Sequence, residues 1–459
     1  MSDQSSSPDL PRILGPWQAT AVVVGTIIGS GIFLVPQEMM QAAGRSSLVY
    51  LAWFAGGALS LFGAMTYAEL GAMRPYAGGE YVYLRDAYGD LTAFLYMWSW
   101  FVLAKPASIA TITIGLVRVL VTFPALRWLD GPVFHGTFSL AWGQLLAISM
   151  AWLITGLNYL GIRRAGEFQL VFTWLKIVLV AVIVAFCFSS PVGNALNFTT
   201  FFPGSRGGVT GFMVALVAAL WAYDGWNNLN AVAGEIRQPE RNVPIALTIG
   251  VGTVAVLYMA TNAAIQYILP ATAIAHSPRP AQVAMQLVAG PWGATLVSLG
   301  MALSIVVTLN GTVLAGARVP FAAARDGLFF RPMMRIHPRF QSPSTSLVVQ
   351  AWVSTLLLLF IGKFQQLFEL ALFAEWLFYM LTATTLFVFR HRDPGAPRPY
   401  RVHGYPLLPA FFVLASAAVL AYTFAHNLRN SLAGLCVMAI GLPLYFWLRR
   451  HNADTGAGI

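Results

Sequence analysis

Ionisable and amide side chains occur in the middle of long apolar stretches of this chain. Residues 221–228 read Trp-Ala-Tyr-Asp-Gly-Trp-Asn-Asn, so Asp224 and two amides interrupt an apolar run. Lys176 lies equally deep in the run 167–189. A charge at membrane depth is energetically costly and is by default a candidate for function. The chemistry that such groups offer is the binding of a polar ligand inside a bilayer.

A second kind of interruption lies near the N-terminus, where residues 25–31 read Gly-Thr-Ile-Ile-Gly-Ser-Gly within the apolar run 17–40. Small flexible residues in succession favour a break in a membrane helix, and unwound backbone at that depth must line protein or a cavity. The alternative is close packing, because Gly25 and Gly29 form a small-xxx-small pair. Taken alone, this stretch favours packing over binding.

The composition is that of a polytopic membrane protein. Hydrophobic residues make up 58% of the chain and charged residues only 10%, where a soluble domain has about 25% charged residues. The mean hydropathy is +0.68. Runs of about 20 apolar residues predict membrane-spanning helices, and we count twelve, which we number as spans one to twelve: 17–40, 48–73, 91–122, 140–160, 167–189, 208–232, 243–269, 284–313, 345–361, 365–389, 406–425 and 431–448.

The formal charge of +10 follows from topology and does not indicate nucleic-acid binding. With the N-terminus inside, 18 of the 27 lysines and arginines fall in cytoplasmic segments and six in outer loops, which is the usual inward bias. We therefore expect both termini in the cytoplasm. The first ten residues are polar and lack a basic start, so we expect no cleaved signal peptide.

Neither a metal site nor a cofactor is expected. Both cysteines, Cys187 and Cys436, fall in predicted helices, and all seven histidines lie in loops or near span ends. This pattern offers no disulfide framework and no set of metal ligands within the membrane.

The two interruptions lie in spans one and six, which correspond if the first ten spans are two repeats of five. Because five is odd, the second repeat is inverted relative to the first, and paired breaks in corresponding spans point to a transport site at the membrane midplane. We expect four parts: a cytoplasmic tail (1–12), the first repeat (13–200), the second repeat (201–392), and spans eleven and twelve with a cytoplasmic tail (393–459). The segment 74–90 predicts a cytoplasmic interfacial helix.

The sequence resembles the amino acid-polyamine-organocation transporters. Residues 25–33 are similar to their span-one motif, and residues 221–230 with 235–244 are similar to span six and the following loop of the L-type amino acid transporter subfamily. The resemblance covers roughly residues 13–450. It implies an all-α fold of twelve transmembrane helices with a five-plus-five inverted repeat and broken spans one and six, as in LeuT-like transporters. It also implies movement of amino acids by alternating access, usually as exchange.

The resemblance also implies where the substrate binds. Free N–H groups after the first break would hold the carboxylate, and carbonyls freed at Ile27, Trp221 and Asp224 would accept the ammonium group. The substrate-binding set is Ile27, Gly29, Ser30, Gly31, Trp221, Ala222, Asp224 and Asn227. Trp221 is either the aromatic gate over the substrate or a core tryptophan, and Asn227 either holds the unwound segment or contacts the ligand.

Asp224 and Lys176 each have more than one interpretation. Asp224 either attracts a cationic side chain or caps the second half of span six. Lys176 resembles the family's replacement of a sodium ion by a fixed ammonium, bonded to carbonyls near Gly25 and to hydroxyls such as those of Ser304 and Thr308. Transport would then be independent of sodium. The lowered pKa that a buried lysine can have leaves proton coupling open, and a lysine neutralised or hydrated at a helix interface is a further alternative.

The function expected is exchange of neutral and, through Asp224, cationic L-amino acids across a bacterial inner membrane. A proton-coupled importer, a non-transporting amino acid sensor and, least favoured, an intramembrane enzyme are the alternatives. Residues 121–140 lack the cysteine by which animal light chains bond a heavy chain, so we expect a monomer or weak homo-oligomer without such a partner. Lys105, Glu369 and Glu375 have no assigned role.

Overall fold

Long apolar helices form most of the chain, as the apolar runs predict. The computed structural model describes residues 10–134, 140–360 and 364–454. Within them, eight helical segments are long and apolar enough to cross a membrane, and two shorter apolar helices cover Gly208–Ala222 and Ser344–Leu359. Strands β1 (Pro132–Phe134) and β2 (Leu140–Ala141) pair in one small antiparallel sheet.

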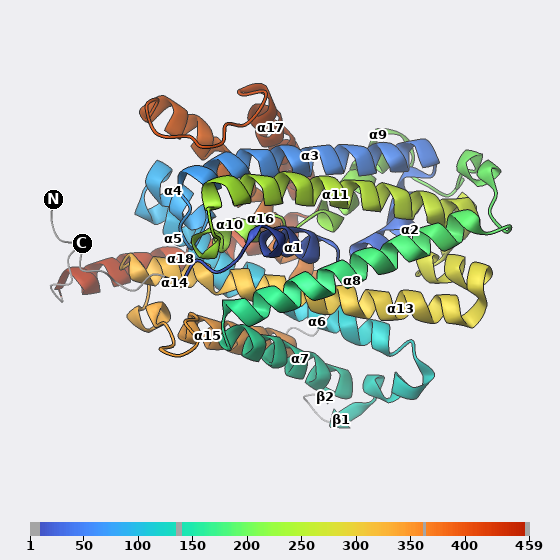
Figure 1. The fold of residues 1–459 in the computed structure, drawn as a ribbon, viewed down its shortest axis with the longest axis horizontal. Coiled ribbons are helices and arrows are strands. Elements are labelled where there is room, and N and C mark those ends of the chain that lie inside the picture. Colours follow the sequence, from blue (N-terminus) through green and yellow to red (C-terminus); the bar gives the residue numbers. More distant parts are fainter. Residues whose placement is uncertain (1–9, 135–139, 361–363, 455–459) are drawn as a thin grey trace.

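The helices follow one another in the order shown in Figure 1. The first half contains α1 (Pro16–Ile27), α2 (Gly31–Ala43), α3 (Ser46–Met73), α4 (Glu80–Tyr88), α5 (Asp90–Ser99), η1 (Trp100–Ala104), α6 (Lys105–Leu120), η2 (Pro124–Asp130), α7 (Trp142–Tyr159), α8 (Ile162–Ser189) and η3 (Ala195–Thr199). The second half contains α9 (Gly208–Ala222), α10 (Asn228–Ala231), η4 (Ala233–Glu235), α11 (Pro239–Ile268), α12 (Ala271–His276), α13 (Pro280–Gly316), α14 (Arg318–Arg325), η5 (Arg331–Met334), α15 (Ser344–Phe360), α16 (Phe364–Arg392), α17 (Leu407–His426) and α18 (Leu428–Asp454).

Both predicted helix breaks are present. The run 17–40 is divided into α1 and α2 by residues 28–30, and the run 208–232 is divided into α9 and α10 by residues 223–227. The helix predicted within residues 74–90 is α4. Span three is continuous but contains the π-helical turn η1 immediately before Lys105 and Pro106. Because proline has no N–H to donate, a wider turn at this point is physically reasonable.

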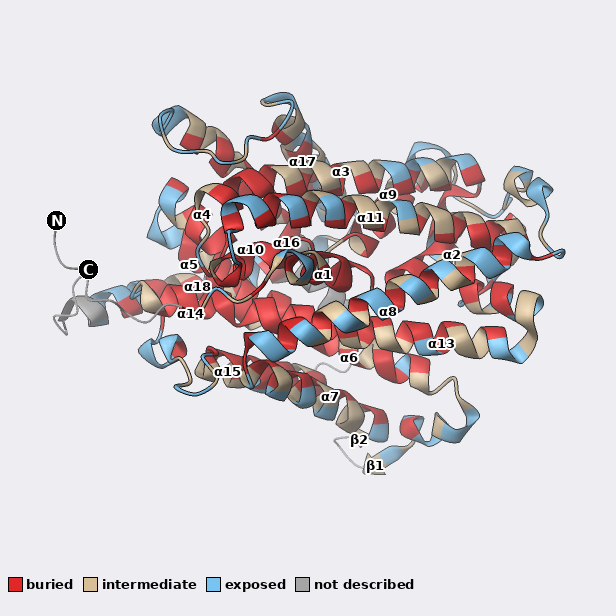
Figure 2. Ribbon diagram, in the orientation of Figure 1, coloured by how far each residue is buried: buried red, intermediate tan, exposed pale blue. Residues whose placement is uncertain are grey.

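Helix α1 lies in the middle of the bundle, where α8, α11 and α13 pack around it (Figure 1). Helix α2 packs mainly against α9, so the two interrupted helices cross in the interior. The outer faces of peripheral helices are apolar and exposed, as Val171, Trp174 and Val178 of α8 illustrate. Figure 2 shows this difference as buried helices in the centre and exposed stripes on α8. Such an apolar exterior suits contact with lipid.

Candidate functional site

The two helix breaks meet in the interior of the bundle. Gly225 has a φ of +105°, a conformation that favours glycine, and a Cβ atom there would lie 2.9 Å from Cγ2 of Thr26. The unwound segment of span six therefore touches the end of α1 directly. A side chain at residue 225 would force the two segments apart.

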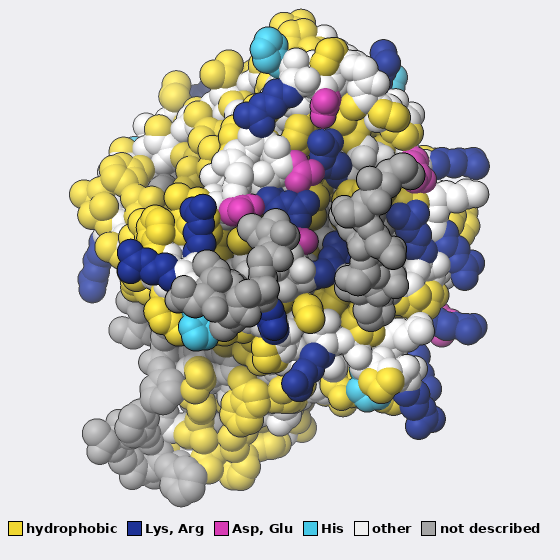
Figure 3. All heavy atoms as spheres, turned by 90° about the vertical axis from the view of Figure 1, so that its left-hand side faces the viewer, with side chains coloured by type: hydrophobic (Ala, Val, Ile, Leu, Met, Phe, Trp, Pro, Cys, Tyr) yellow, Lys and Arg dark blue, Asp and Glu magenta, His cyan; other side chains and the backbone are white. Residues whose placement is uncertain are grey.

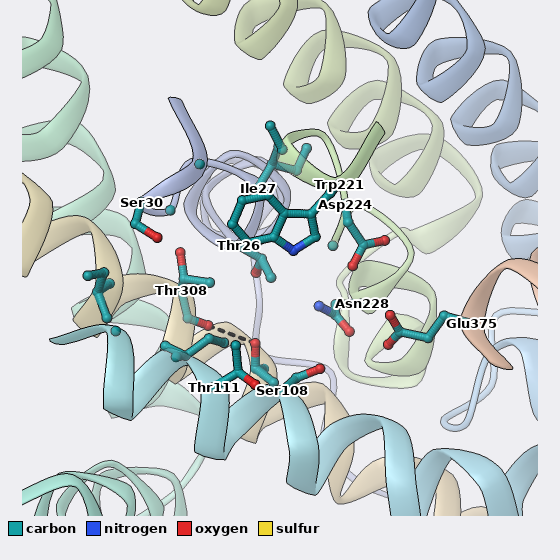
Figure 4. Close-up of a pocket in the computed structure, with 18 of the residues that line it drawn as sticks. Thr26, Ile27, Ser30, Ser108, Thr111, Trp221, Asp224, Asn228, Thr308 and Glu375 are labelled. Carbon is teal, nitrogen blue, oxygen red and sulfur yellow. Dashed lines mark hydrogen bonds between the residues drawn. The ribbon is translucent and has the colours of Figure 1, made fainter. Parts of the chain in front are cut away.

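A cavity opens beside this contact. It is lined by residues of both breaks and by side chains of α6, α13 and α16. Of the eight residues that the sequence predicts to bind substrate, seven line it: Ile27, Gly29, Ser30, Gly31, Trp221, Ala222 and Asp224. Figure 4 shows Ser30 on one side of the indole of Trp221 and Asp224, Asn228 and Glu375 on the other. The cavity thus has one end at the start of α2 and another end rich in carboxylates.

The end at the start of α2 can accept an anion. Ser30 is the N-cap residue and Gly31 the first residue of α2, and the first N–H groups of a helix have no acceptor within their own helix. They carry the positive end of the helix dipole, which favours a carboxylate. A Cβ atom on Gly31 would lie 3.2 Å from Cβ of Ala222, so only glycine leaves this approach open.

A tyrosine that sequence reasoning missed joins the two breaks. The hydroxyl of Tyr258 on α11 is 2.9 Å from the carbonyl oxygen of Ile27 and 2.8 Å from that of Ala222. The Ile27 carbonyl, expected to be free, also accepts the N–H of Gly29 at 2.8 Å. Nothing local distinguishes Tyr258 from other core aromatics, because its role depends on carbonyls far away in the sequence.

Lys176 is fully buried and bonds the backbone of span one. Its Nζ lies 2.6 Å from the carbonyl oxygen of Gly25 and 2.7 Å from that of Ile28. The hydroxyl of Thr308 donates toward the same two oxygens at 3.2 and 3.3 Å. The expected contact with Ser304 is absent, because the Ser304 hydroxyl has no partner among the described residues. The lysine and Thr308 together satisfy carbonyls that the break leaves open.

Gly25 packs against α8 rather than facing the cavity. A Cβ atom there would lie 2.2 Å from Nε2 of Gln169 and 2.4 Å from Oγ1 of Thr173. Gln169 in turn accepts from the amide of Asn310 at 2.7 Å, and Asn310 accepts from Asn158 at 2.9 Å. This chain of buried amides connects α7, α13 and α8, and it ends on α1, where Gln169 and Thr173 donate to the carbonyl of Ala21.

Asp224 faces the cavity and accepts the hydroxyl of Tyr379 at 2.8 Å. The capping interpretation of Asp224 is wrong, because the N-cap residue of α10 is Asn227. Asn227 does not line the cavity and instead donates to Glu80 at 3.2 Å. Its side chain therefore joins the unwound segment to α4, and its contact with a ligand stays a prediction.

Lys105 and Glu375, which have no role assigned from sequence, form a buried ion pair at the edge of the cavity. Their Nζ and Oε1 atoms are 3.1 Å apart, and the ammonium also lies 4.0 Å from the ring centroid of Trp100. Both side chains line the cavity. The side chain of Glu369 lies outside those that the structure describes.

Comparison with known proteins identifies the family. The amino acid permease family profile matches residues 14–442, nearly the whole chain. The chain belongs to the amino acid permease family.

Named relatives of this permease are transporters. It is 31% identical to the serine/threonine exchanger SteT of Bacillus subtilis, over 97% of this chain and 98% of SteT. It is 31% identical to the human b(0,+)-type amino acid transporter 1, over 97% of this chain and 89% of that protein. It is 28% identical to the human cystine/glutamate transporter, over 94% and 83% respectively. The permease is thus a transporter of the same family rather than an enzyme.

A buried ion pair and a short backbone pairing join three segments near the start of α1. Glu235 and Arg318 form two hydrogen bonds, of 2.8 and 3.2 Å, with neither side chain exposed. The carbonyl of Glu235 also accepts the N–H groups of Ile13 and Leu14, both at 2.9 Å. Glu235 therefore joins the segment before α1, the segment after α10 and α14.

Proposed function

We propose that this permease exchanges L-amino acids across the plasma membrane by alternating access, without sodium. The observation that carries the proposal is the cavity between two interrupted helices, with the Lys176 ammonium bonded to two carbonyls of the first break. A fixed ammonium at the carbonyls of a break takes the place that a coupling cation would occupy. Relatives described as exchangers or amino acid transporters support the same function.

The proposed substrate lies with its carboxylate at the N-terminus of α2, near Ser30 and Gly31, and its ammonium group near the carbonyls of the two breaks. Trp221 then covers the substrate as a gate. The side chain extends toward Asp224, which suits neutral and cationic amino acids. This orientation places each charged group of the zwitterion against complementary groups, which keeps its desolvation cost low.

The proposed architecture is twelve membrane spans, of which the first ten form two inverted repeats of five, at 13–200 and 201–392. We place both termini in the cytoplasm. Support comes from the end of the bundle drawn in Figure 3, where many Lys and Arg side chains are exposed. Exposed arginines in the segments that we assign to the cytoplasm include Arg12, Arg237, Arg241, Arg331, Arg335 and Arg339. Basic residues favour the cytoplasmic side. We propose a bacterial inner-membrane location and a monomer or weak homo-oligomer.

Proteoliposomes test the exchange directly. Uptake of a labelled amino acid should require an unlabelled amino acid inside and should persist without sodium and without a proton gradient. Uptake that needs no internal amino acid and collapses with the proton gradient would replace exchange by proton-coupled import. Binding without any flux would make the protein a sensor.

A further inference from the structure

Three buried carboxyl groups and one ammonium group lie in or next to the cavity. Asp224 and Glu375 line the cavity, Glu80 lies behind Asn227, and Lys105 bonds Glu375. Glu80 is 1% exposed and has no basic partner within ion-pair distance in the described part of the chain. If all four groups were ionised, the cluster would carry two uncompensated negative charges in the interior. Such charges are strongly unfavourable at this depth.

Hydrogen bonds reduce this cost but do not balance the charge. Tyr96 and Asn227 donate to Glu80, and Tyr379 donates to Asp224. Burial raises the pKa of Glu80 to about 7 despite these donors. The cluster therefore holds fewer negative charges than it has carboxyl groups, unless a cation binds.

An unpartnered acceptor shows where a cation would bind. Asn228 is 1% exposed, lines the cavity, and its Oδ1 has no hydrogen-bond partner among the described residues. Figure 4 shows its amide below the carboxylate of Asp224 and to the left of the carboxylate of Glu375. A carbonyl oxygen and two carboxylates around one space are suitable acceptors for an ammonium group, which has three donors.

We propose that Asp224 holds a proton while the site is empty or holds a neutral amino acid, and that the side-chain ammonium of a cationic amino acid displaces this proton. The inference rests on the proposed transport function and adds how the binding site balances the charge of a cationic amino acid. The titratable and charged groups around Asp224 are Glu375 and Tyr379 of α16, Lys105 of α6, Glu80 of α4, Tyr96 of α5 and Tyr67 of α3. Lys105 is the single cation among them and already bonds Glu375.

The step is a simple proton exchange. The O–H bond of the Asp224 carboxyl breaks, its electron pair stays on the oxygen, and the proton leaves to water. The incoming ammonium keeps its three protons and pairs with the new carboxylate and with Oδ1 of Asn228. Binding of a cationic amino acid then leaves the net charge of the site unchanged, whereas a neutral amino acid binds without proton release.

Calorimetry on the purified full-length protein tests the proposal with L-lysine and L-norleucine, which differ by one ammonium group. Heats are measured at pH 7 in phosphate and in Tris, whose ionisation enthalpies differ, so the number of protons released can be extracted. We expect release of about one proton per lysine bound and none with norleucine. Lysine binding without proton release, or equal release with both ligands, overturns the proposal.

Two further comparisons keep the outcomes distinct. Asp224→Asn should remove the lysine-linked proton release, while Asp130→Asn, an exposed carboxylate on η2, should leave it unchanged. If Asp224→Asn does not fold, the proposal is tested by comparing proton release on lysine binding and on norleucine binding to the unaltered protein. Norleucine binding and exchange without lysine binding overturns the inference but not the transport function. Absence of binding by both amino acids, together with absence of flux, contradicts both.

Discussion

The ammonium of Lys176 lies 2.6 Å from the carbonyl oxygen of Gly25 and 2.7 Å from that of Ile28, so one side chain bonds backbone on both sides of a helix end. Thr308 is the other donor to these oxygens. The geometry of the first break therefore depends on a residue almost 150 positions away, and this dependence can be tested.

Lys176→Ala should impair exchange while the protein still folds. Thr308 has one hydroxyl hydrogen for the two carbonyls, so at least one of them would lose its donor, at a cost of about 1–3 kcal/mol. We therefore expect exchange in proteoliposomes to slow by about tenfold or more. Arg163→Ala, at an exposed ion pair on the same helix, is the matched control and should exchange normally. Unchanged sodium-free exchange by Lys176→Ala would disprove the role of ion substitute.

Gly31→Val should abolish substrate binding. A Cβ atom at Gly31 would lie 3.2 Å from Cβ of Ala222 and 3.6 Å from the Trp221 ring, and valine's further methyl groups would fill the space before α2. Gly156→Val is the control, because a Cβ atom there meets nothing within 4 Å. Binding measured by calorimetry should be lost only in the first variant, and wild-type affinity there would refute the carboxylate position.

Asp224→Gly should weaken binding of cationic amino acids more than binding of neutral ones. A hydrogen bond to a charged group is worth about 1.5–3 kcal/mol, so affinity for lysine should fall by about ten- to a hundredfold. Affinity for norleucine should change much less. An equal loss for both ligands would show that Asp224 acts on the site's shape and not on side-chain charge.

Glu235→Ala should destabilise the closed end of the bundle. It leaves the fully buried Arg318 guanidinium without its carboxylate, and removal of one partner of a buried pair costs about 3–5 kcal/mol. We expect a clear drop in the apparent melting temperature in detergent. The double variant Glu235→Leu with Arg318→Met should recover much of it, and a double variant as unstable as the single one would argue against charge burial as the cause.

Glu80 should make the permease less stable as pH rises. Its pKa is raised by burial to about 7 in the folded protein, above the ordinary value of about 4.3 expected for the unfolded chain. The folded state therefore binds this proton more tightly than the unfolded chain does. The contribution of the protonated Glu80 to the free energy of unfolding is fully present below about pH 4 and is lost as pH rises through about 7. Glu80→Gln should flatten this decline in apparent melting temperature between pH 5 and 8. An unchanged profile would exclude Glu80 as its source.

The two helix breaks and the cavity-lining residues next to them could be predicted, because the sequence features that mark them lie close together in the chain. Glycines 29 and 31 and the polar run 221–228 interrupt apolar sequence, and seven of eight predicted binding residues line the cavity. Gly25 illustrates a limit, since its spacing favours packing over binding but leaves both open. Only the positions of Gln169 and Thr173 assign it to packing.

Partners distant in the sequence could not be predicted in the same way. Lys105 and Glu375 are 270 residues apart and have no shared motif, although each is a conspicuous charge in an apolar run. The amides of Asn158 and Asn310 lie 152 residues apart and resemble ordinary polar residues near span ends. The resemblance implies both Ser304 and Thr308 as hydroxyls near Lys176, but only Thr308, one helical turn further along α13, bonds the carbonyls that Lys176 bonds.

The hydroxyl of Tyr258 lies within hydrogen-bonding distance of the carbonyls of both Ile27 and Ala222, yet it carries one hydrogen. At any instant it can satisfy only one of them fully. An ammonium group that reaches the breaks, as we propose for the substrate, would find one of the two oxygens without the tyrosine's hydrogen, and rotation about the C–O bond of Tyr258 would decide which break offers it. The choice between the Ile27 and Ala222 carbonyls as acceptor therefore needs no movement of the backbone.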